Sequence, residues 1–224
     1  MDSSWFAVLD IYCERTSAAF WSEPVNALTN LAFFAAAAGG FLHWRRAGRR
    51  DWPLLILTGI VVLIGIGSFL FHTFATRITA IADTAPIAIF IYGYLLLALT
   101  RFLRLPWWAA LATLVGFAVF SAALPLIAPV GLRHGSLSYL PAFCALIVIG
   151  CLVTDKQIAR LLLWAAAAFA LSLTLRTIDM AVCATLPLGT HFMWHVLNAL
   201  VLYLLLRAAA LRPGIVAAPE AQPR

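Results

Sequence analysis

The sequence has few charged residues. Only 11% of its 224 residues are Asp, Glu, Lys or Arg, whereas a soluble domain carries about 25%. Hydrophobic residues make up 64% of the chain, so too few polar side chains remain to cover a globule of this size. The composition therefore excludes a soluble enzyme, a disordered chain and a nucleic-acid-binding domain. It indicates a protein that crosses a membrane several times.

Long apolar runs account for this composition. A membrane helix needs about 20 mostly apolar residues, and the sequence predicts seven such spans, at about 25–43, 53–72, 80–100, 107–128, 136–153, 158–177 and 187–208. The connections between them are short, so we expect an all-α membrane protein with one bundle of seven transmembrane helices over residues 25–208. Residues 1–24 are expected to form an extracytoplasmic segment, and residues 209–224 a disordered tail in the cytosol.

The distribution of basic residues predicts the orientation of the bundle. The net charge of +6 comes mainly from arginines between the spans. The connections on the C-terminal side hold eleven basic residues: Arg45, Arg46, Arg49, Arg50, Arg101, Arg104, Lys156, Arg160, Arg207, Arg212 and Arg224. The opposite side holds four, namely Arg15, Arg77, Arg133 and Arg176. The positive-inside rule therefore places the N-terminus outside and the C-terminus in the cytosol.

Ionisable residues inside the spans are rare, and each is costly unless it is paired, hydrated or bound to a metal. His72 ends the second span, and Asp83 lies near the start of the third. His191 and His195 lie near the start of the seventh span. Because consecutive spans run in opposite directions, all four residues are expected in the outer half of the bundle.

The spacing of the histidines suggests a metal site. His191 and His195 are four residues apart on one helical face, so both imidazoles can reach one ion. His72 would complete a catalytic zinc site with three histidine ligands and an open fourth position. Such an ion lowers the pKa of water to about 7 and polarises a carbonyl oxygen. Ser68 lies on the same face as His72, and Asp83 is a candidate proton acceptor.

Two other interpretations of the histidines stay open at this point. Taken alone, His191 and His195 are equally well explained as polar contacts within the bundle. His43 and His134, at the edges of loops, are better explained in that way. A histidine from each of two spans can also clamp a haem, as in a membrane electron carrier.

Several segments together resemble the alkaline ceramidase family. They are Gly67–His72 (GSFLFH), Asp83–Pro86 (DTAP) and His191–His195 (HFMWH), together with Tyr12–Glu14 (YCE) and Glu23–Asn30 (EPVNALTN) near the N-terminus. The matches run from about residue 10 to residue 195 in the family's order. This family belongs to a group of seven-span membrane hydrolases that also includes the adiponectin-receptor-like proteins. The alanine- and arginine-rich chain with short loops suggests a bacterial member, located in the cytoplasmic membrane.

The resemblance implies a zinc-dependent hydrolase that cleaves the amide bond of ceramide or a ceramide-like lipid to a long-chain base and a fatty acid. His72, His191 and His195 would hold the zinc ion. Asp83 would orient and deprotonate the attacking water, and Ser68 would hydrogen-bond the developing oxyanion. The substrate would enter from the bilayer, and the active site would lie toward the extracytoplasmic side. A receptor-like protein of the same group, with little hydrolysis, is the alternative.

Animal members of the family also hold a calcium ion through an acidic cluster before the first span. Glu14 and Glu23 match that cluster. Ile11 replaces the first acidic ligand, with Asp10 one residue away, and Thr16 replaces an asparagine ligand. An acid-rich segment that caps the first span explains the two glutamates equally well, so the sequence leaves calcium binding open.

The resemblance also implies a disulfide. Cys13 and Cys183 both fall on the outer side, where a disulfide can persist. The residues before Cys183 are similar to the family segment whose cysteine pairs with the N-terminal one. A Cys13–Cys183 bond would pin the N-terminal segment over the end of the sixth span, near the mouth of the zinc site. Asp179 would anchor the same rim or simply lie at the helix end.

Overall fold

The computed structural model describes residues 3–129 and 135–212, so Arg133, His134, Arg224 and the expected tail from residue 213 onward lie outside the described residues. Within these ranges the chain is helical and forms no strand beyond one isolated bridge, between Val8 and Thr76. The elements are η1 (Ser3–Phe6), α1 (Pro24–Thr29), α2 (Leu31–Arg46), α3 (Trp52–Phe74), α4 (Arg77–Leu97), η2 (Ala98–Phe102), α5 (Trp107–Ile127), η4 (Leu137–Tyr139), α6 (Leu140–Leu152), α7 (Lys156–Val182) and α8 (His191–Leu211).

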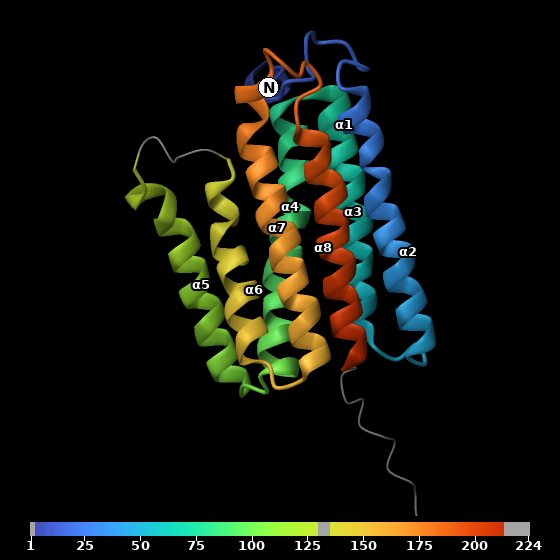
Figure 1. The fold of residues 1–224 in the computed structure, drawn as a ribbon, viewed down its shortest axis with the longest axis vertical. Helices are drawn as coiled ribbons and strands as arrows, with labels where there is room; N and C mark the ends of the chain where they lie inside the picture. Colours follow the sequence, from blue (N-terminus) through green and yellow to red (C-terminus); the bar gives the residue numbers. More distant parts are fainter. Residues whose placement is uncertain (1–2, 130–134, 213–224) are drawn as a thin grey trace, which may run out of the picture.

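The helices match the predicted spans. In the described part of the chain, six segments are long and apolar enough to cross a membrane: Pro24–Arg46, Trp52–Phe74, Arg77–Phe102, Trp107–Ile127, Lys156–Val182 and His191–Leu211. A shorter apolar helix, Leu137–Leu152, lies where the fifth span is expected. These seven helices run along one another as a single bundle (Figure 1). The all-α multi-span fold is therefore confirmed, whereas the orientation of the termini stays a prediction.

The helices differ in how much of their surface they bury, and α5 buries least of the long ones. Helix α5 has a single buried residue, Ala110, and side chains such as Val119, which is 64% exposed, point away from the bundle. Helix α8 packs against α2 and α7. A soluble protein rarely exposes so much contiguous apolar surface, but lipid tails cover it in a membrane. The outer surface thus supports the assignment from composition.

Helices α3 and α4 approach each other closely. A Cβ atom at Gly67 would overlap the backbone carbonyl of Ala82, so only glycine fits there. The connection between the two helices is equally tight, because Ala75 takes a left-handed conformation (φ 46°) and Thr76 caps the start of α4. The approach brings the start of α4, with Asp83, beside the end of α3.

The opposite end of the bundle is held by a buried ion pair. Asp51 caps α3 by accepting the backbone N–H of Leu54 at 3.3 Å. Its carboxylate also accepts hydrogen bonds from Arg101 Nη1 at 2.7 Å and Nη2 at 2.9 Å. Arg101 further donates to the carbonyl oxygen of Ala209 at 3.3 Å. The pair therefore joins α3, η2 and α8.

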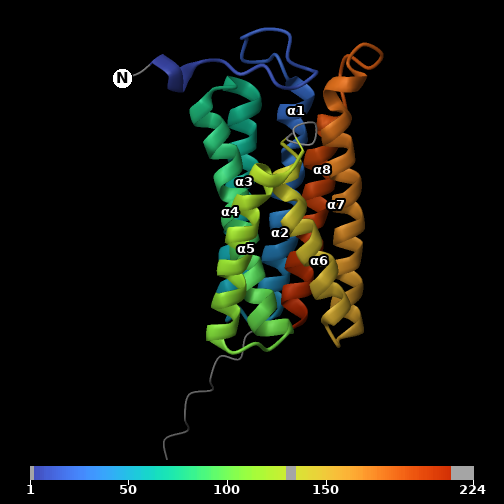
Figure 2. The same ribbon diagram turned by 90° about the vertical axis from the view of Figure 1, so that its left-hand side faces the viewer.

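The N-terminal segment lies across the other end of the bundle (Figure 2). The backbone N–H of Leu9 donates to the carbonyl oxygen of Ala75 at 2.6 Å, next to the bridge between Val8 and Thr76. These contacts hold the segment on the turn between α3 and α4. It thus covers the end of the bundle where the predicted site residues lie.

Candidate metal centre

Three histidines converge beneath the N-terminal segment. His72 comes from the last turn of α3, and His191 and His195 come from the first two turns of α8. All three are buried, with 0–2% of their surface exposed. One ligand nitrogen from each lies within 4.8 Å of the others. In the described ranges, no other group of three or more His, Cys, Asp or Glu side chains is close enough to hold an ion.

Each of these imidazoles has one buried nitrogen without a hydrogen-bond partner among the described residues: Nε2 of His72, Nε2 of His195 and Nδ1 of His191. The other nitrogens of two rings are engaged, because His72 Nδ1 lies 2.6 Å from Glu23 Oε2 and His195 Nδ1 lies 2.9 Å from Thr29 Oγ1. Buried polar atoms are rarely left unpaired, and neutral imidazole nitrogens are common zinc ligands. The donor set therefore fits a metal ion.

Glu23 determines which ring nitrogen of His72 donates a hydrogen bond. Burial raises the pKa of this carboxyl, but the hydrogen bond from His72 and the contacts with Asn26 and Arg15 outweigh burial and lower the pKa below its ordinary value. The ionised carboxylate can only accept hydrogen bonds, so Nδ1 of His72 donates to it, and Nε2 is the nitrogen without a partner among the described residues. A carboxylate behind a ligand histidine plays the same orienting part in many zinc sites.

Tyr12 packs on the third histidine. Its ring stacks on His191 with centroids 3.6 Å apart and an angle of 18° between the planes. Burial, partly opposed by Arg176, raises the pKa of Tyr12 to about 12, so the phenol stays protonated at neutral pH. Tyr12 belongs to the YCE motif, but the motif alone does not indicate a role for its ring.

Ser68 and Asp83 meet beside the histidines. Ser68 and His72 both lie near enough to Asp83 to interact electrostatically with its carboxylate. Ser68 is buried on α3, one turn before His72. The close packing at Gly67 thus brings together the two residues for which the sequence predicts roles in proton transfer and oxyanion binding. Those roles stay predictions.

The Cys13–Cys183 disulfide that the resemblance implies is present in the structure. It joins the N-terminal segment to the residue that follows α7. Gly189 lies beside it with φ +66°, and a Cβ atom at this glycine would come 2.6 Å from the Cβ of Cys13. Glycine is therefore required both for the backbone conformation and for the space.

Asp179 ties the same segments together by hydrogen bonds. Its Oδ2 accepts the backbone N–H of Cys13 at 2.9 Å, and its Oδ1 accepts those of Thr190 at 2.6 Å and His191 at 2.8 Å. The carboxylate thus caps the start of α8 next to a candidate metal ligand. Of the two roles left open by the sequence, anchoring the rim is the one observed.

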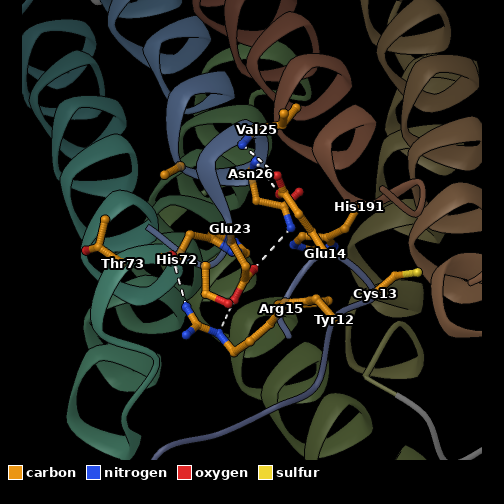
Figure 3. A network of polar contacts seen from close by, with 12 residues as sticks. Tyr12, Cys13, Glu14, Arg15, Glu23, Val25, Asn26, His72, Thr73 and His191 are labelled. Atoms are coloured by element: carbon orange, nitrogen blue, oxygen red, sulfur yellow. Dashed lines mark hydrogen bonds and ion pairs between the residues drawn. The ribbon is translucent and has the colours of Figure 1, made fainter. Parts of the chain in front are cut away.

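The acidic residues near the N-terminus do not gather into an ion site. Glu14 caps α1, because its carboxylate accepts the backbone N–H groups of Val25 at 2.7 Å and Asn26 at 2.8 Å (Figure 3). Asp10 is exposed. In the part of the chain that the structure describes, Asp10, Glu14 and Glu23 form no group close enough to hold an ion. Glu14 therefore caps the first span, which is the second of the two interpretations that the sequence left open.

An apolar cavity of about 80 Å³ lies inside the bundle, next to the histidines. Each of the six long spans and the shorter α6 contributes to its walls. The lining includes Phe33, Ile64, Phe90, Phe117, Leu146, Phe169 and Trp194. Trp194 directly precedes His195, and the Phe33 ring centroid is 6.3 Å from that of His195. The cavity therefore adjoins side chains that flank the histidine cluster.

A comparison with protein families shows to which family the chain belongs. Residues 11–215 match the family model described as ceramidase. The chain belongs to the ceramidase family. No curated protein matches the chain. Membership confirms the resemblance carried by the motifs and supports a ceramidase-like hydrolase with a lipid substrate in the membrane.

Proposed function

We propose that this member of the ceramidase family is a zinc-dependent intramembrane hydrolase that cleaves the amide bond of ceramide or a ceramide-like lipid. The products would be a long-chain base and a fatty acid. The observation that carries the proposal is the set of three buried nitrogens, from His72, His191 and His195, that lack a partner among the described residues. Family membership supports the choice of a lipid amide as substrate.

His72, His191 and His195 would hold the ion, with Glu23 and Thr29 fixing the orientation of two of the rings. A bound zinc ion supplies Lewis acidity, which lowers the pKa of water and polarises an amide carbonyl. The fourth position of such a three-histidine site stays open for water or substrate.

The remaining chemistry is assigned to Asp83 and Ser68. Asp83 would take a proton from the attacking water as the new C–O bond forms, and would return it to the amine nitrogen as the C–N bond breaks. The Ser68 hydroxyl would donate a hydrogen bond to the oxygen of the carbonyl as negative charge develops there. Both side chains lie on the α3–α4 face that adjoins His72.

The substrate would reach the site from the bilayer. The cavity next to Trp194 is apolar and suits a hydrocarbon chain, and the amide would then lie at the level of the histidines. The basic residues between the helices support an orientation with the N-terminal segment and the site toward the extracytoplasmic side.

The first test is the metal content of the detergent-purified protein, measured by mass spectrometry. We expect about one zinc ion per chain in the wild type, by the three-ligand argument, and loss of both zinc and ceramide turnover in His195→Ala. His43→Ala is the matched control, because His43 lies in the last turn of α2, away from the histidine cluster. This variant should keep both the zinc ion and the ceramide turnover.

Protein purified without chelators that contains no zinc would contradict the proposal, and a visible absorption spectrum would then test the haem alternative. Zinc without turnover of any lipid amide would favour the receptor-like alternative.

A further inference from the structure

Arg15 is a buried cation at the heart of the N-terminal segment, with 4% of its surface exposed. Its Nε donates to Glu23 Oε1. Its Nη1 donates to the carbonyl oxygen of Ser17 and its Nη2 to that of His72, each at 3.1 Å. Figure 3 shows the guanidinium between these segments. The three partners are all oxygens, two from the N-terminal segment itself and one from the end of α3.

Carboxylate and backbone carbonyl oxygens are also the ligands that calcium takes. A calcium ion at this place would have to compete with Arg15 for the same atoms. The neighbouring oxygens are already engaged, because Glu23 Oε2 accepts hydrogen bonds from His72 and from Asn26 Nδ2, and both oxygens of Glu14 cap α1. The residues present therefore do not fit the calcium ion that animal members of the family hold.

The loop after Arg15 is also held by side chains. Ser22 Oγ accepts the backbone N–H groups of Thr16 at 3.1 Å and Ser17 at 3.0 Å. This closes the loop and turns the Ser17 carbonyl toward the guanidinium. Thr16, which stands where the family has an asparagine ligand, contributes its backbone to this closure.

We propose that the Arg15 guanidinium takes the place of that calcium ion, so that the N-terminal segment folds and Glu23 keeps its position without calcium. Arg15 would thereby also act as a positioning residue for His72, through Glu23. Only this last step rests on the proposed function, since the replacement of calcium concerns the fold of the segment whether or not the protein is a hydrolase.

The test compares calcium binding and thermal unfolding of the full chain in calcium and in a calcium chelator. The wild type should bind no calcium and should melt at the same temperature in both. Arg15→Asn removes the cation and leaves the oxygens, so its melting temperature should fall by on the order of 10 °C in the chelator. Calcium should bind this variant and restore part of the loss.

Arg77→Asn is the matched control, because Arg77 is exposed at the start of α4 on the same side of the bundle. It should melt like the wild type and show no response to calcium. Calcium binding that stabilises the wild type would overturn the proposal. A folded Arg15→Asn variant that binds no calcium and melts at the same temperature with and without it would also overturn the proposal.

If Arg15→Asn does not fold, the wild type and Arg15→Lys decide the question. Lysine keeps the positive charge, so calcium-independent melting of both proteins supports the proposal, and a calcium-induced rise in either overturns it. No arm of the test uses zinc or turnover, so a failure of the proposed hydrolase would leave its result unchanged.

Discussion

Two carboxylates near the histidines, Glu23 and Asp83, have different surroundings and should therefore have separable roles. Glu23 contacts the nitrogen of His72 that faces away from the cluster, whereas Asp83 lies toward Ser68. A group that hydrogen-bonds to a metal ligand influences how tightly the metal is held. A group that faces the substrate influences the rate of proton transfer.

For Glu23→Gln we expect zinc affinity to fall by about 10- to 100-fold, as is typical when the partner of a ligand histidine is lost. The neutral amide accepts a weaker hydrogen bond from His72 and does not compensate the charge of Arg15. Competition with a chromophoric chelator would measure the affinity. Asp10→Asn, in the same segment but exposed, should bind zinc like the wild type, and equal affinities in both variants would contradict this role of Glu23.

For Asp83→Asn we expect zinc content to be kept and turnover of ceramide to fall by about 10²- to 10⁴-fold, the usual contribution of a general acid or base. Asparagine occupies nearly the same volume but cannot accept the proton of the attacking water. Steady-state hydrolysis together with metal analysis would measure both quantities. Hydrolysis at the normal rate would show that the proton acceptor is misassigned.

At the scale of helices, the contact between α3 and α4 depends on the absence of a side chain at Gly67. For Gly67→Ala we expect a loss of about 1–3 kcal/mol in the free energy of unfolding, because the new Cβ would overlap the carbonyl of Ala82. Gly59→Ala is the matched control on the same helix, since a Cβ atom there meets no atom within 4 Å. If both variants unfold at the wild-type temperature, the two helices are not held by this contact.

The far end of α3 offers a second comparison. Asp51 and Asp155 both cap helices, and asparagine caps about as well as aspartate, but Asp51 also binds Arg101. Asp51→Asn should therefore cost about 3–5 kcal/mol, the range for breaking one side of a buried ion pair, whereas Asp155→Asn should be nearly neutral. Thermal unfolding of the two variants in one detergent would measure the difference.

For the whole molecule, the Cys13–Cys183 bond closes a loop across most of the chain. We expect Cys13→Ser and Cys183→Ser each to lower the free energy of unfolding by about 2–5 kcal/mol. Cys151→Ser, at an exposed position of α6, should not. Mass mapping of the oxidised protein should find the Cys13–Cys183 peptide, and free thiols at both positions would contradict the structure.

The sequence predicted the convergence of His72, His191 and His195 because the direction and length of membrane spans determine the depth of each residue. It did not predict the contacts of Tyr12 or Arg15, because these depend on the path of an irregular segment that no periodic pattern describes. From the sequence, Arg15 was considered only as one of the basic residues counted on each side of the bundle. Thr29 was within reach of sequence reasoning, since it lies in the matched EPVNALTN segment on the helix that follows Glu23.

The order of synthesis has a consequence for the N-terminal segment. Its covalent anchor, Cys183, and its hydrogen-bonding anchor, Asp179, lie at the end of α7, and two of the three histidines follow on α8. A ribosome must therefore finish nearly the whole bundle before the segment can be fastened and the histidine cluster completed. Chains that are cut short before α8 would lack a complete histidine cluster, so the proposed hydrolase activity could not begin while the protein is still being inserted into the membrane.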